Sequence, residues 1–223
     1  MKNIFYGLLI ALIFSACKIT TIDESGTKPR TVPNLIQTWY AAESVEAFSS
    51  IPTYNVIGLG FKTRSVGDHY YQDLYDDYHY NKSRDSYTAF VNLFDRLEIT
   101  SDNVFNGIPA GDDLGEMFWI LAESPYKWLK SKAQEEYDWS QPMPEIPFSD
   151  SNIRKAMLYE EPWFHPIIKK VSELSKEDLY LLSGWIHLVP VEQPELKDHN
   201  LTIKLFEGSV CMECTVFVSF ESE

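Results

Sequence analysis

The C-terminal part of the chain alternates apolar and polar residues in two runs, separated by the turn Glu207-Gly208-Ser209. The apolar positions of the two runs are Leu201, Ile203, Leu205, Val216, Val218 and Phe220. Successive side chains of a β-strand point to opposite faces, so this spacing gives each run one apolar face. The pattern predicts a β-hairpin. A hairpin with one apolar face needs a second layer to cover that face.

Three further segments have the character of strands, and they are residues 54–63, 93–100 and 186–190. In the first of them, Ile57, Leu59 and Phe61 share an apolar face. Gly58 and Gly60 share the other face, which predicts the close approach of a second backbone or of a large aromatic ring. Aromatic residues make up 14% of the chain, so a large core can form without a framework of disulfides. The sequence therefore predicts a mainly β fold.

A central stretch departs from the strand pattern. Ser124-Pro125 is typical of the start of a helix, and Ser149 or Asp150 caps a second short helix up to Glu161-Pro162. Pro166 opens a third candidate helix, whose apolar side would carry Ile167, Ile168, Val171 and Leu174. Ser175 and Asp178 then have the spacing of a capping box, although the residues from Leu179 onward suit a buried strand equally well. We predict a helical insertion at about 124–174, within a single domain that spans residues 35–223.

The N-terminus begins with one charged residue, Lys2, and an apolar run from Ile4 to Phe14. A run of this length matches the core of a signal peptide and is too short for the ~20 residues of a membrane-spanning helix. It ends in Phe14-Ser-Ala-Cys17, which resembles a lipobox. In bacterial lipoproteins that cysteine receives lipid and the peptide is cut before it. We expect a signal peptide over residues 1–16, lipidation at Cys17 and a flexible tether to residue 34; an ordinary secretory signal is the alternative.

The net charge of the chain is −14 at pH 7, and removal of residues 1–16, which hold one lysine and no acid, brings it to −15. A chain this acidic lacks the basic face that nucleic acids or anionic lipid headgroups require. Attachment to the membrane is therefore expected through the lipid on Cys17 alone. The expected location is the bacterial cell envelope, at the outer membrane. The sequence contains no cofactor fingerprint, and no cofactor is predicted.

Two motifs resemble a known group of proteins. Glu98-Ile-Thr-Ser-Asp-Asn-Val-Phe-Asn106, followed by Pro109-Ala-Gly-Asp-Asp-Leu114 and Phe118, is similar to cell-envelope lipoproteins of unknown function from the Bacteroidetes. The closing order of apolar strand, proline, His199 and hairpin is similar too. The resemblance implies an antiparallel immunoglobulin-like β-sandwich behind a lipobox, with residues 124–174 as an insertion. It implies no activity.

The run from Asp68 to Tyr80 is the most unusual part of the chain, because it contains two histidines, four aspartates and five tyrosines. Tyrosine gives a large contact area with a polar tip, which suits a surface that binds glycan or protein. The candidate ligand-binding residues are His69, Tyr70, Tyr71, Asp73, Tyr75, Asp77, Tyr78 and His79. A solvated acidic loop is the alternative without function. A metal site on a helix through His69, Asp73 and Asp77 is a third possibility, which we do not predict.

Cys211 and Cys214 are the two cysteines that remain once Cys17 carries lipid. The residues after Cys214 read as a strand, so the pair lacks the helix N-terminus of a redox CxxC motif. A structural zinc site would need two more ligands, of which His187 or His199 could supply only a partial set. We expect a local disulfide in an exported protein, with free packed thiols as the alternative.

Asp112, Asp113 and Glu116 are close in sequence, and pairs of carboxylates are what glycoside hydrolysis uses. A Gly-Asp-Asp sequence is also ordinary turn chemistry, which we favour here. Two functions follow from the sequence. The first is a non-enzymatic envelope lipoprotein that binds glycan, peptide or another envelope protein through loops of a β-sandwich. The second is a glycan hydrolase that uses acids of the 112–116 region.

Overall fold

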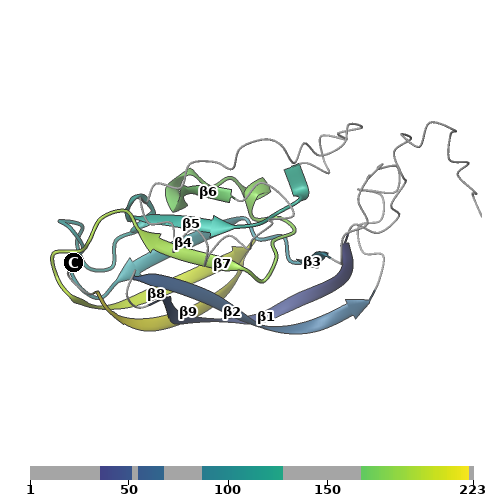
Figure 1. Cartoon of the computed structure of the whole chain (residues 1–223), viewed down its shortest axis with the longest axis horizontal. Helices are drawn as coiled ribbons and strands as arrows, with labels where there is room; N and C mark the ends of the chain where they lie inside the picture. Colours follow the sequence, from purple (N-terminus) through teal and green to yellow (C-terminus); the bar gives the residue numbers. More distant parts are fainter. Residues whose placement is uncertain (1–35, 52–54, 68–86, 128–166, 221–223) are drawn as a thin grey trace, which may run out of the picture.

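The computed structural model describes residues 36–51, 55–67, 87–127 and 167–220, and within these ranges the chain is mainly β (Figure 1). The strands are β1 (Ile36–Ile51), β2 (Val56–Gly67), β3 (Tyr87–Phe90), β4 (Arg96–Ser101), β5 (Phe118–Ala122), β6 (Ile167–Lys170), β7 (Ile186–Pro190), β8 (Asp198–Glu207) and β9 (Val210–Ser219). Three short 3-10 helices join them, η3 (Gly115–Met117), η4 (Val171–Glu173) and η5 (Lys176–Asp178). The predicted mainly β fold is confirmed.

The described strands form two sheets. One has the order β3-β1-β2-β7-β5-β6 and the other has the order β4-β8-β9. Neighbouring strands are antiparallel except β1 and β3, which are parallel. The expectation of a fully antiparallel arrangement is therefore wrong at this pair. The chain leaves β2 at Gly67, opposite Trp39, and re-enters the sheet at Tyr87 beside Ile36, so β3 has to run in the direction of β1.

We call the two ends of the sheets the N-terminal end and the loop end. The N-terminal end holds the start of β1, the end of β2 and the turn between β8 and β9. The buried Asn92 joins the two sheets there through hydrogen bonds to Ala42 and Glu207. At the loop end, β4 stops at Ser101, β5 begins opposite Pro190, and β8 begins. The termini of the described chain lie at opposite ends, with Ile36 at the N-terminal end and Phe220 at the loop end (Figure 1).

The C-terminal hairpin is present as predicted. β8 and β9 pair from Asp198 opposite Ser219 to Glu207 opposite Val210, and Gly208 makes the turn with a φ of +60°. This left-handed conformation favours glycine, and the Gly208 N–H donates to Asp95 Oδ2 at 2.9 Å. The six apolar side chains predicted for the inner face are all buried.

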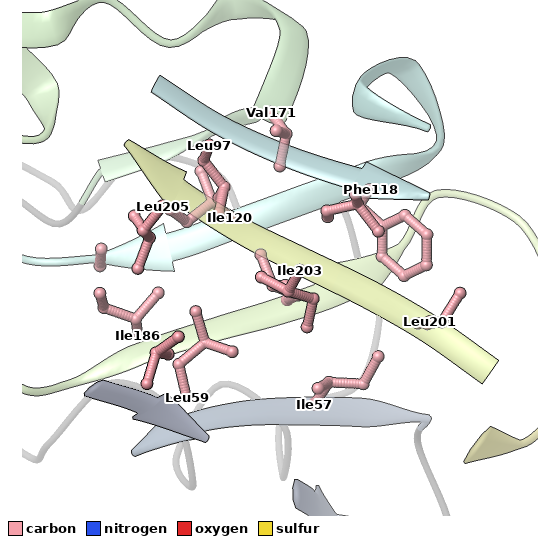
Figure 2. Packing of buried hydrophobic residues seen from close by; sticks show 14 of the residues in the cluster. Ile57, Leu59, Leu97, Phe118, Ile120, Val171, Ile186, Leu201, Ile203 and Leu205 are labelled. Atoms are coloured by element: carbon pink, nitrogen blue, oxygen red, sulfur yellow. The ribbon is translucent and has the colours of Figure 1, made fainter. Parts of the chain in front are cut away.

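The main core lies between the two sheets. Figure 2 shows Leu201, Ile203 and Leu205 of β8 facing side chains of the six-stranded sheet. The facing residues are Ile57 and Leu59 of β2, Phe118 and Ile120 of β5, and Ile186 of β7. Full burial of one large aliphatic side chain contributes about 1.5–3 kcal/mol, so this layer holds the sheets together.

The two glycines of β2 lie beneath an aromatic ring, as their shared face predicted. A Cβ on Gly58 would come within 2.7 Å of Cε2 and Cζ of Phe48, its cross-strand neighbour on β1. A Cβ on Gly60 would lie 3.1 Å from the Glu46 side chain and 3.4 Å from Phe48. The ring of Phe48 can therefore pack this close to β2 only because these positions have no side chain.

The prediction of a helical insertion is wrong for residues 167–170, near its C-terminal end. Residues 167–170 form strand β6, which pairs with β5 from Ile167 opposite Ala122 to Lys170 opposite Trp119. β-Branched isoleucines suit a strand, and β5 offers a backbone edge that a helix could not use. Residues 128–166 lie outside the described residues, so the rest of the insertion stays a prediction. The predicted strand at 186–190 and the capping box at Ser175 and Asp178 are confirmed, although the box opens only the short helix η5.

Candidate functional site

Two loops run side by side at the loop end, one after β4 and one before β8. The side-chain Nδ2 of Asn103 donates to the Asp198 carbonyl oxygen at 3.1 Å. The amide of Asn106 binds the facing loop twice: its Oδ1 accepts from the Glu195 N–H at 2.9 Å, and its Nδ2 donates to the Gln193 carbonyl at 3.3 Å. These three bonds align residues 103–106 with residues 193–198, and we call the pair the paired-loop surface.

A buried polar pair supports the paired-loop surface from below. The Ser101 hydroxyl and His199 Nδ1 are 2.8 Å apart, and His199 Nε2 lies 2.9 Å from the Leu196 carbonyl oxygen. A carbonyl oxygen only accepts, so Nε2 carries a hydrogen. In the neutral form of the ring, Nδ1 is then the acceptor of the Ser101 hydroxyl. The imidazole packs against the rings of Phe105 and Phe220, with centroids 5.0 and 5.6 Å away. The pair thus links strand β4, strand β8 and both loops.

This serine and histidine do not form a catalytic pair. Both side chains are buried, so a substrate could not reach the hydroxyl. The Asn103 N–H also donates to the hydroxyl oxygen at 3.1 Å. In serine hydrolases the serine lies at Nε2 and a carboxylate binds Nδ1, whereas here the serine lies at Nδ1 and Nε2 binds a backbone carbonyl. The pair has a structural role.

The paired-loop surface exposes two aliphatic side chains on the backbone that these hydrogen bonds hold in place. Val104 is 49% exposed and Leu196 is 48% exposed, whereas Phe105 between the loops is fully buried. Val104 lies between Asn103 and Asn106, and Leu196 lies between Glu195 and Asp198, so both occupy the stretch that the three hydrogen bonds bracket. Asn106 and Gly107 turn the first loop with φ values of +45° and +85°.

Two of the three acids at 112–116, Asp113 and Glu116, are engaged in local structure. Asp113 forms a backbone bridge with Thr100, and its Oδ1 accepts from the Ile99 N–H at 3.4 Å. Glu116 Oε2 lies 3.1 Å from Lys170 Nζ, and hydrogen bonds from Ser172 and Lys170 lower the pKa of Glu116. A general acid in glycoside hydrolysis needs a raised pKa, so the lowered pKa of Glu116 does not suit that role.

The cysteine pair does not have the geometry of a disulfide. Cys211 and Cys214 are both free thiols, and both belong to strand β9. Three residues of a strand span about 10 Å and end on opposite faces, whereas a disulfide needs Cα atoms within about 7 Å. The expected local disulfide is therefore wrong. Burial, with the charges of Glu213 and Glu46, raises the pKa of Cys214 to about 11, which disfavours the reactive thiolate.

The predicted ligand-binding run, from His69 to His79, lies outside the described residues, as do Cys17 and the tether. The structure does place the points where that segment joins the sheet. Gly67 and Tyr87 are both at the N-terminal end, away from the paired-loop surface. The described residues contain no group of three His, Cys, Asp or Glu side chains arranged to hold a metal ion. Within the same ranges, no helix has the length and hydrophobicity to cross a bilayer.

Sequence reasoning did not find the paired-loop surface. Asn103 and Asn106 entered through the motif that resembles envelope lipoproteins, and His199 entered only through that resemblance and as a partial zinc ligand. The sequence signal for these loops is Asn103 followed by Asn106-Gly107. Asparagine side chains in such turns can form hydrogen bonds with backbone groups. Comparisons of the chain with models of protein families, with curated proteins and with solved structures find no match.

Proposed function

We propose that this chain is a bacterial envelope lipoprotein, anchored through lipid on Cys17, whose β domain is a non-enzymatic binding module. Its fold would be an immunoglobulin-like sandwich, and it would recognise a glycan, a peptide or another envelope protein through loops. The paired-loop surface is the recognition surface that the described residues support best. The tyrosine-rich run from His69 to His79 remains a second predicted element of recognition.

One observation carries the proposal: Val104 and Leu196 are half exposed on a backbone that three side-chain hydrogen bonds and a buried histidine hold in place. Binding is costly when loops must be ordered, so loops that are already ordered lose less free energy on association. A rigid scaffold that presents loops at one end is also the arrangement in which β-sandwiches most often carry function.

The position of the surface agrees with a lipid anchor. The chain enters β1 at Ile36, at the N-terminal end, and the paired-loop surface lies at the other end of the sheets (Figure 1). The predicted tether would therefore join the domain at the end away from the loops. The loops would remain accessible to a partner in the envelope or outside it.

Two double variants test the proposal. Val104→Ser with Leu196→Ser removes the exposed apolar atoms of the paired-loop surface, and Val210→Ser with Phe217→Ser removes two more exposed side chains from β9. Each lipidated full-length protein is compared with wild type for capture of envelope proteins by quantitative mass spectrometry and for binding to a glycan array. We expect the first variant to lose a specific ligand that the β9 variant keeps. Unchanged binding by the loop variant, or turnover of an array glycan by the wild type, would reject the proposal.

A further inference from the structure

We propose that the paired-loop surface binds a positively charged polypeptide segment whose aliphatic side chains contact Val104 and Leu196. This inference rests on the recognition role proposed above and names the chemistry of the partner. Two features of the described residues carry it. One is that Val104 and Leu196 are exposed on the hydrogen-bonded loops, and the other is the excess of acidic side chains in the same loops.

The loops at this end carry a net negative charge within the described residues. Residues 102–114 and 191–198 contain one lysine, Lys197. Their six carboxylates are Asp102, Asp112, Asp113, Glu192, Glu195 and Asp198. None of the six forms an ion pair with a described residue. The ion pairs that join two described residues include Arg64–Glu43, Arg96–Glu98, Lys127–Asp178, Lys169–Asp178, Lys170–Glu116 and Lys204–Glu213.

These carboxylates are placed to act on a partner. Asp112, Glu192 and Glu195 are exposed, so their charges face solvent. Hydrogen bonds from the side chain and backbone of Asn200 lower the pKa of Asp102, which keeps that carboxylate ionised. Uncompensated charge of one sign around a docking surface attracts partners of the opposite sign and repels partners of the same sign.

The chemistry of the surface favours a polypeptide over other cationic or polar ligands. Sugar rings stack on exposed aromatic faces, yet Phe105 is the one aromatic residue in the two loops and it is fully buried. A divalent cation would need several converging oxygens, and the described residues form no such group. A segment with alternating lysine and leucine side chains would place aliphatic groups on Val104 and Leu196 and ammonium groups beside the carboxylates.

The test uses the full-length protein in nanodiscs of zwitterionic lipid and two fluorescent decapeptides, one of alternating lysine and leucine and one of alternating glutamate and leucine. Fluorescence anisotropy measures their affinity. The loop variant is Asp112→Asn, Glu192→Gln and Glu195→Gln. The control variant is Glu43→Gln, Glu98→Gln and Glu213→Gln, which removes the same charge from sites that are ion-paired elsewhere.

We expect the lysine peptide to bind, the loop variant to weaken its binding at least tenfold, and the control variant to weaken it less than twofold. Val104→Ser with Leu196→Ser should also weaken it, and the glutamate peptide should not bind. Equal losses of affinity in the two charge variants would show that the peptide responds only to the net charge of the protein, and this would overturn the inference. If the lysine peptide fails to bind while the loop double variant still loses a glycan or an envelope protein, the recognition role stands and the cationic partner is wrong.

Discussion

The Ser101 hydroxyl lies 2.8 Å from Nδ1 of His199, beneath two loops that come from distant parts of the chain. The same imidazole binds the Leu196 carbonyl through its other nitrogen, so one side chain fixes the end of β4 and the loop before β8 together. The position of the paired-loop surface therefore depends on a buried polar pair rather than on loop sequence alone.

Ser101→Ala removes the hydrogen bond to Nδ1 and the acceptor of the Asn103 N–H. We expect a loss of about 1–3 kcal/mol in the free energy of unfolding, because a buried donor or acceptor is left without its partner. Urea unfolding followed by tryptophan fluorescence measures this loss. An unchanged unfolding midpoint would show that the pair does not support the loops.

Gly58→Ala places a methyl group within 2.7 Å of the Phe48 ring. The ring has to move off the sheet, and we expect a cost of about 1–3 kcal/mol in unfolding free energy. Gly184→Ala is the matched control, since its added Cβ would lie 3.7 Å from Phe90, an ordinary contact. In a double-mutant cycle, the cost of Gly58→Ala should shrink once Phe48 is alanine. A cost that persists in that background would place the strain in the backbone.

Asp178 is a buried carboxylate that accepts from two lysines, Lys127 Nζ at 2.6 Å and Lys169 Nζ at 3.1 Å. Burial alone would raise its pKa, but hydrogen bonds from Lys127, Ser175 and Lys169 outweigh burial and hold the pKa at about 2, below the ordinary 3.8. The contribution of the charged form is therefore present above pH 3.8 and disappears as the pH falls to 2. It amounts to about 2 kcal/mol.

Asp178→Asn should be less stable than wild type at pH 7, and this difference should shrink by about 2 kcal/mol between pH 5 and pH 2. Denaturant unfolding of both proteins across this pH range measures it. A difference that does not change with pH would mean that the lysines do not hold the carboxylate in its charged form.

The pKa of Glu123 is shifted in the opposite direction from that of Asp178. Burial raises its pKa to about 7, above the ordinary 4.5, so the folded protein holds a proton that the unfolded chain has released between these values. Stability is then lost as the pH rises from 4.5 to 7, by about 3 kcal/mol. Glu123→Gln should be more stable than wild type at pH 8, and the two should converge below pH 4.5. Parallel pH profiles for the two proteins would contradict this assignment.

The parts of the fold that local pattern determines were predictable. The alternation in the C-terminal hairpin and the shared face of Gly58 and Gly60 both follow from the period of two in a strand. The spacing of Ile167, Ile168, Val171 and Leu174 also fits a helix, and only the free edge of β5 selects the strand. Cys211 and Cys214 suggested a disulfide because they are close in sequence, whereas the rise of the strand separates them.

The paired-loop surface could not be predicted, because its contacts join distant residues. Asn103 and Asp198 are 95 positions apart, and Asn106 and Glu195 are 89 positions apart. Nothing local to either loop specifies the partner of an asparagine amide. The sequence can mark both loops as turns, and the packing of β4 against β8 brings them together.

Recognition through the paired-loop surface is tested most directly by site-specific photo-crosslinking in the native cells. A photoreactive benzoyl-phenylalanine replaces Val104 or Leu196 in one set of strains and Val210 or Phe217 in another, all four being exposed. We predict that positions 104 and 196 crosslink to a common partner and that positions 210 and 217 do not. Crosslinks that form from 210 and 217 alone, or from none of the four positions, would contradict the account.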